Sequence, residues 1–130
     1  LARALMKPTK LYSDLFSILK SKIKIHGAAH ITGGGLTDNI PRILPKQYIA
    51  KIDPSSWSLP KIFKLIQEKA MLTEEDMFKT FNCGIGMVLI INKNDIKKLF
   101  ILASKLKYKP KVIGYVTKRN INKIIIYEKN

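Results

Sequence analysis

Apolar residues recur along the first third of the chain with two different spacings. After Pro8, which suits a first helical turn, leucine and isoleucine recur at intervals of three and four, predicting a helix over residues 9–21. Apolar residues then alternate with others, predicting a strand over 22–31. Three glycines at 33–35 predict a turn, and the helical spacing of the apolar residues after them predicts a short helix.

The middle of the chain predicts one strand and two helices. The strand covers residues 46–53, and a helix follows over 59–69, with Ser58 as its expected N-cap and a proline in its first turn. Thr73 precedes a cluster of acidic residues, as is typical of a helix start. We therefore expect a second, short helix that ends near Phe81.

The C-terminal third predicts three strands and one helix. An uninterrupted apolar run at 87–92 predicts a buried strand, followed by a helix over 93–107. Strands are expected over 110–118 and 122–129, with 118–122 as a hairpin turn that makes them antiparallel neighbours. The order of elements predicts an α+β fold in which helices pack on a mixed or antiparallel sheet, not a doubly wound parallel sheet.

Length and composition predict one domain with a real core. The chain has 130 residues, of which 46% are hydrophobic, and no apolar run approaches the roughly 20 residues that span a bilayer, so we expect no membrane partner. A single cysteine, Cys83, excludes an internal disulfide and favours a reducing, cytoplasmic location. One cysteine and two histidines make no convincing zinc site. The chain begins without Met, and we expect residues 1–8 to be the remnant of a linker.

The net charge of +15 raises the question of a nucleic-acid partner. All but three of the 24 basic residues are lysines, and they are scattered along the chain. Base recognition favours arginine, and the aromatic residues form no stacking patch, so we expect no nucleic-acid partner. A basic RNA-binding module remains the alternative, which a steep dependence of affinity on salt would reveal. Phosphorylated metabolites would also be attracted to such a surface.

The segment "HITGGG" is the strongest candidate for chemistry. Glycines between a strand and a helix let backbone N–H groups approach an anion, whereas a tight turn that needs steric room is the alternative. The segment is neither a Walker A loop nor a GxGxxG fingerprint. His30 is the candidate general acid or base, or else a histidine that is hydrogen-bonded inside the fold. His26 is the weaker candidate.

Polar residues after the glycines and a second glycine segment extend the candidate site. Arg42 is either a candidate phosphate clamp or a solvated side chain. Asp38 either contacts a ligand or caps a helix, and Asn39 either contacts a ligand or holds a turn. The segment "TFNCGIGM" predicts either a second loop of the same cleft or a β-bulge. We expect Cys83 to be no nucleophile and Trp57 to cover the edge of the core.

Three segments together carry a family resemblance. "HGAAHITGGGLTDNIPRILP", "IDPSSWSLPKIFKLIQ" and "MFKTFNCGIGMVLII", in this order and spacing, resemble the C-terminal domain of the phosphoribosylformylglycinamidine cyclo-ligases, also called aminoimidazole ribonucleotide synthetases. The resemblance covers residues 8–128 and implies a single, partly ferredoxin-like α+β domain that closes over the substrate. These homodimeric enzymes use ATP and Mg²⁺ to close the imidazole ring of formylglycinamidine ribonucleotide in purine biosynthesis, giving aminoimidazole ribonucleotide, ADP and phosphate.

The resemblance also implies roles for residues. His30 would be catalytic. The residues that would bind substrate or phosphate are Thr32, Gly33, Gly34, Gly35, Asp38, Asn39, Arg42, Asn82, Gly84 and Gly86. ATP and Mg²⁺ would be bound mainly by an N-terminal domain that this chain lacks, so we expect no metal ligand here and no activity from this chain alone. Other ATP-using members of the superfamily, namely formylglycinamidine ribonucleotide synthetase, selenophosphate synthetase and thiamine-monophosphate kinase, remain alternatives.

Overall fold

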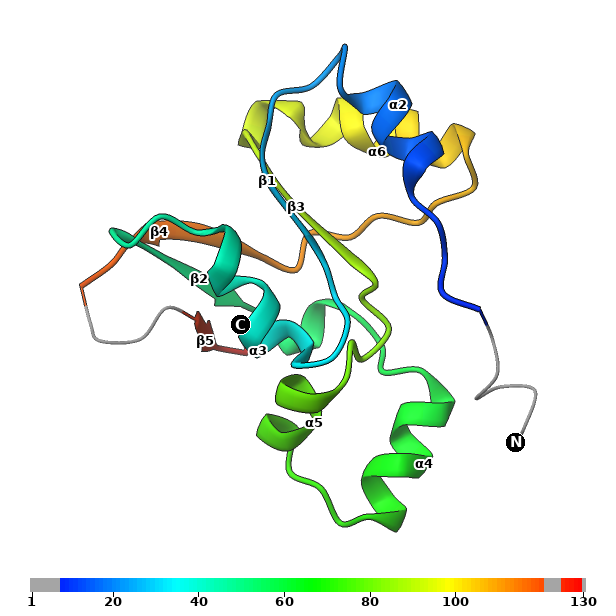
Figure 1. The fold of residues 1–130 in the computed structure, drawn as a ribbon, viewed down its shortest axis with the longest axis vertical. Helices are drawn as coiled ribbons and strands as arrows, with labels where there is room; N and C mark the ends of the chain where they lie inside the picture. The colour runs from blue at the N-terminus through cyan, green and yellow to red at the C-terminus, as the bar shows by residue number, and fades with distance from the viewer. Residues whose placement is uncertain (1–7, 121–124, 130) are drawn as a thin grey trace.

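The chain folds into an α+β arrangement, as predicted (Figure 1). The structure is a computed structural model, and it describes residues 8–120 and 125–129. The helices and strands, in chain order, are α2 (Ser13–Leu19), β1 (Ile25–His30), α3 (Gly35–Asn39), β2 (Tyr48–Ile52), α4 (Lys61–Lys69), α5 (Glu74–Thr80), β3 (Met87–Ile91), α6 (Ile96–Lys105), β4 (Gly114–Lys118) and β5 (Ile125–Tyr127). Single 3-10 turns cover Pro41–Ile43, Pro54–Ser56 and Lys93–Asp95.

The expected single sheet is divided into two. Strands β1 and β3 form an antiparallel ribbon, and the other sheet has the order β4-β2-β5. Figure 1 shows the ribbon running from the α2–α6 pair at one end toward α3 and α5 at the other. A register shift between Ile25 and Gly27 leaves His26 out of the β1–β3 pairing.

The predicted hairpin between the last two strands is wrong, because β2 lies between them. Strand β4 pairs antiparallel with β2, and β5 pairs parallel with its other edge. The central strand is the most deeply buried one, with Ile49, Ala50 and Ile52 at 0%, 2% and 4% exposure, so burial favours placing it between two neighbours. The segment "KRNIN" contains no glycine of the kind that tight hairpin turns require. Residues 121–124 of this prediction lie outside the described residues.

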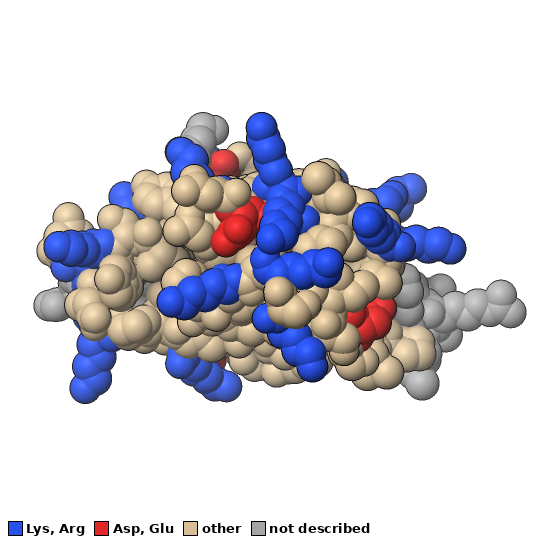
Figure 2. All heavy atoms as spheres, turned by 90° about the horizontal axis from the view of Figure 1, so that it is seen from above, with Lys and Arg blue, Asp and Glu red and all other residues tan. Residues whose placement is uncertain are grey.

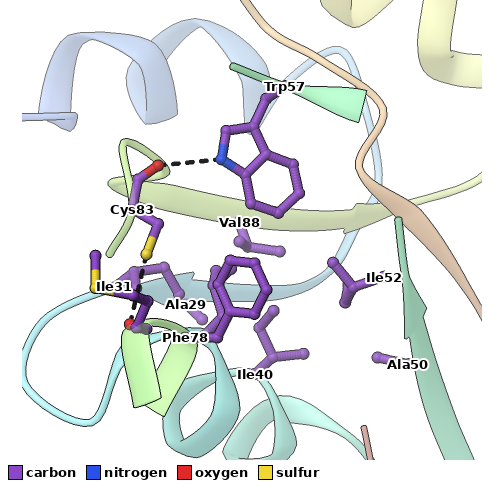
Figure 3. Close-up of a cluster of buried hydrophobic side chains, with 11 residues drawn as sticks. Ala29, Ile31, Ile40, Ala50, Ile52, Trp57, Phe78, Cys83 and Val88 are labelled. Carbon is purple, nitrogen blue, oxygen red and sulfur yellow. Dashed lines mark hydrogen bonds between the residues drawn. The ribbon is translucent and has the colours of Figure 1, made fainter. Parts of the chain in front are cut away.

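Two hydrophobic clusters cover the two faces of the β1–β3 ribbon. Ala29 and Val88 belong to the larger cluster, with residues of β2, α3 and α5 (Figure 3). Leu89 and Ile91 pack instead against the smaller cluster, which includes Leu19 of α2 and residues of α6. Contacts on both faces explain the uninterrupted apolar run that predicted this strand.

Of the two helix caps that the sequence predicts at Thr73 and Ser58, the structure confirms one and contradicts the other. Thr73 caps α5 in a reciprocal capping box with Asp76, as its sequence predicted. The expected Ser58 cap of α4 is wrong, because the helix begins at Lys61 and Pro60 is its N-cap residue, with an extended ψ of 146°. A residue that precedes a proline is biased toward extended backbone, which disfavours Leu59, where the predicted helix began, as a helical residue.

Candidate functional site

The two glycine segments lie side by side at one end of the β1–β3 ribbon. His30 is the last residue of β1 and pairs with Met87, the first residue of β3. Immediately beyond it, the Ile31 N–H donates a hydrogen bond to the carbonyl oxygen of Gly86 at 3.0 Å. The His30 side chain is exposed. The fold therefore places a solvent-facing imidazole where the two segments meet.

The three consecutive glycines differ in whether the structure requires a glycine at their position. Gly34 and Gly35 both adopt left-handed backbone, with φ of 89° and 56°. A Cβ on Gly35 would also overlap the carbonyl oxygen of Phe78, at the point where α3 packs on α5. A Cβ on Gly33 would meet no atom within 4 Å. Only Gly33 thus faces open space on a backbone that any residue could adopt.

The backbone amides of this turn differ in whether they are already hydrogen-bonded. The Gly35 N–H donates to the carbonyl of Thr32 at 3.1 Å, so it is already used inside the turn. The N–H groups of Thr32, Gly33 and Gly34 donate to no other residue within the described parts of the chain. Those three amides are therefore the ones that an anion could engage.

Asn39 holds the glycine turn together from inside. Its side chain is 7% exposed, and its Nδ2 donates to the carbonyls of Gly33 at 3.1 Å and Gly35 at 2.8 Å. Its Oδ1 accepts from Nη1 of Arg42 at 3.5 Å. The structure thus gives Asn39 the turn-holding role, while Arg42 and Asp38 lie exposed on either side of it.

The second glycine segment is a tight turn whose conformation is locally determined. Oδ1 of Asn82 accepts the Gly84 N–H at 3.0 Å, and the Asn82 carbonyl accepts the Ile85 N–H at 2.8 Å. Gly84 is left-handed, with φ of 92°, and a Cβ there would collide with Pro60. The glycine at this position is therefore required by the backbone itself.

Cys83 and Trp57 are core residues, as expected. The Cys83 side chain is fully buried, its thiol donates to the carbonyl of Met77 at 3.4 Å, and burial raises its pKa to about 11. A thiol that keeps its proton at neutral pH is a poor nucleophile. The Trp57 indole N–H donates to the Cys83 carbonyl at 3.0 Å, which anchors the second glycine turn to the core (Figure 3).

Tyr12, which no sequence pattern identified, lies beside His30, and Tyr108 stacks on Tyr12. The Tyr12 ring lies edge-to-face with the His30 ring, with centroids 5.9 Å apart at 71°, and stacks on Tyr108 at 5.7 Å. The Tyr108 hydroxyl donates to Asp14 at 2.7 Å, and Nζ of Lys10 lies 3.6 Å from the centre of the Tyr108 ring. No motif includes these tyrosines, because the approach of Tyr12 to His30 depends on how α2 and α6 pack.

Tyr127, near the C-terminus, is hydrogen-bonded to α3. Its hydroxyl shares a hydrogen bond with Oγ1 of Thr37 at 2.8 Å, and its ring stacks on Phe78 at 4.7 Å. Burial raises the pKa of Tyr127 to about 12. The folded protein therefore favours the neutral phenol, which ties the end of β5 to the helix that follows the glycine turn.

We expect this tyrosine to make the fold sensitive to alkali. Because its pKa rises from 10.0 to about 12 on folding, its contribution to stability is fully present below pH 10 and is lost as the pH rises toward 12. Urea unfolding of wild type and Tyr127→Phe across this range should show a shallower fall of the unfolding free energy in the variant. Identical slopes would contradict this assignment.

The charged side chains on one face of the molecule are dispersed. On the face shown in Figure 2, lysine and arginine side chains point outward in several directions, with acidic side chains between them.

Within residues 8–120 and 125–129, no three His, Cys, Asp or Glu side chains are grouped closely enough to hold a metal ion. In the same residues, no helix has the length and apolar character to cross a membrane.

Comparison with known proteins agrees with the resemblance found in the sequence. Residues 1–127 match the family described as AIR synthase related protein, C-terminal domain. Proteins named phosphoribosylformylglycinamidine cyclo-ligase are 44% identical over 97% of this chain in Thermodesulfovibrio yellowstonii and 46% identical over 90% of it in Geotalea daltonii. The aligned regions are 37% and 34% of those proteins, so the chain spans about a third of their length.

Proposed function

Because the chain belongs to the AIR synthase related protein C-terminal domain family, we propose that it is the substrate-closing domain of a phosphoribosylformylglycinamidine cyclo-ligase. The observation that carries this proposal is the hydrogen bond from Ile31 to Gly86, which joins the two glycine segments beside the exposed His30. Two segments that lie 50 residues apart in the sequence thus form one candidate surface.

In this proposal the substrate phosphate lies against the first glycine turn. The free N–H groups of Thr32, Gly33 and Gly34 would donate to its oxygens, and Arg42 would add positive charge. Gly35 and Asn39 would hold the turn in shape, and Asp38 would contact the sugar. Asn82, Gly84 and Gly86 would form the second wall of the site.

His30 would perform the proton transfer of ring closure. An amidine nitrogen attacks the activated formyl carbon, the phosphorylated formyl oxygen leaves as phosphate, and the nitrogen must lose a proton, which an exposed imidazole can accept. ATP supplies the activation of the formyl oxygen. We assign ATP and Mg²⁺ mainly to an N-terminal domain outside this chain, which would also form most of a homodimer interface. A cytoplasmic location fits the free thiol of Cys83.

The test is a comparison of substrates. The full-length protein that carries this chain should form aminoimidazole ribonucleotide from formylglycinamidine ribonucleotide and ATP, with one ADP for each product. Formylglycinamide ribonucleotide with glutamine, selenide, and thiamine monophosphate should each give no ATP-dependent product above background. Turnover of any of these three, without ring closure, would place the protein with another member of the superfamily.

A further inference from the structure

The side chain of Tyr12 lies across both halves of the candidate site. Its ring contacts the His30 ring edge-on, and its hydroxyl occupies the place where a Cβ on Gly86 would stand. Gly86 is not in left-handed backbone, so its φ does not require a glycine. The close approach of the Tyr12 hydroxyl therefore explains this glycine.

The Tyr12 hydroxyl differs from those of two other tyrosines that pack inside the fold. The Tyr108 hydroxyl is bonded to Asp14, and the Tyr127 hydroxyl is bonded to Thr37. The Tyr12 hydroxyl, on a half-buried ring, has no hydrogen-bond partner within the described part of the chain. No side-chain polar atom that is sealed from solvent lacks a partner among the described residues, so this hydroxyl reaches solvent and is available to a ligand.

The position of the ring is fixed by its neighbours. Tyr12 stacks on Tyr108 at an interplanar angle of 28°, and Tyr108 is held by Asp14. A phenol keeps its proton at neutral pH, and burial raises the pKa of Tyr12 further. Its hydroxyl can therefore donate a hydrogen bond to an acceptor oxygen, such as those of a phosphate or an amide.

We propose that Tyr12 is a substrate-binding residue, whose hydroxyl donates a hydrogen bond to an oxygen of the phosphorylated substrate between His30 and the second glycine turn. This inference rests on the proposed function for the identity of the substrate. It adds the N-cap residue of α2 as a third part of the site, beside the two glycine segments.

The first experiment is Tyr12→Phe in the full-length protein, which removes only the hydroxyl and keeps both ring contacts. We expect KM for formylglycinamidine ribonucleotide to rise about 5- to 10-fold, as for a lost hydrogen bond, with kcat within about twofold and an unchanged melting temperature. Tyr115→Phe, on an exposed tyrosine of β4, is the matched control and should leave KM unchanged. An unchanged KM in Tyr12→Phe, or a parallel loss of kcat and melting temperature, would overturn the proposal.

A second experiment tests the placement of the hydroxyl. Gly86→Ala should lower the melting temperature, because the new Cβ meets the Tyr12 hydroxyl while the next nearest ring carbon lies 3.4 Å away. Adding Tyr12→Phe removes the clashing atom and should restore most of the loss. Failure of the double variant to recover would show that the hydroxyl lies elsewhere, which overturns the proposal.

A binding measurement separates this inference from the proposed function. The ¹³Cζ resonance of Tyr12 should move when ribose 5-phosphate is titrated into the full-length protein, and should not move with ribose. If the wild type fails to close the ring but this resonance moves, the proposed reaction is wrong and the binding role of Tyr12 stands. If the ring closes and the resonance stays fixed, the reaction stands and the role of Tyr12 is wrong.

Discussion

Replacing His30 by alanine in the full-length protein should, on the proposed function, lower kcat for ring closure by about 10²- to 10⁴-fold, the usual contribution of a positioned general acid or base. The melting temperature should change little, because the side chain is exposed and, among the described residues, its ring contact is the edge-on one with Tyr12. Steady-state kinetics and thermal unfolding of the same preparation measure both quantities.

The chain supplies its own control for this substitution. His26 lies at the other end of the same strand, is also exposed, and falls in the irregular register between Ile25 and Gly27. His26→Ala should leave kcat and KM within twofold of wild type. A His30→Ala enzyme with wild-type turnover would refute the catalytic assignment, and a large drop in its melting temperature would give His30 a structural role instead.

Replacing Gly35 by alanine should cause a large loss of stability. Left-handed backbone costs a non-glycine residue about 1–2 kcal/mol, and the added Cβ would overlap the Phe78 carbonyl, so we expect about 3 kcal/mol in total. For a domain of this size the melting temperature should fall by roughly 10 °C. The clash is with backbone whose side chain stacks on Tyr127, so a small shift cannot relieve it.

Gly33→Ala is the matched variant two residues away. Its Cβ would enter open space, and its φ is not in the left-handed range, so the free energy of unfolding should change by less than about 0.5 kcal/mol. Chemical denaturation of the two variants beside wild type measures the difference. Equal stability of the Gly33→Ala and Gly35→Ala proteins would mean that α3 does not pack on α5 as described.

The sequence by itself determined the elements that depend on local chemistry. Helical spacing, the Thr73 capping box and the apolar run before residue 92 each predict structure that the fold contains, because neighbouring residues decide them. The family followed from three segments at their spacing, and the comparisons bear it out. The catalytic and binding roles of individual residues remain predictions.

Tertiary structure decided what depends on long-range contacts. The insertion of β2 between β4 and β5 follows from the burial of β2, the most deeply buried strand, which no local turn signal reports. The three glycines look alike in sequence, yet only the packing of α3 on α5 shows that Gly35 is required and Gly33 is open. Tyr12 reaches His30 because α2 packs beside α6, and a side chain placed by helix packing leaves no pattern in its own segment.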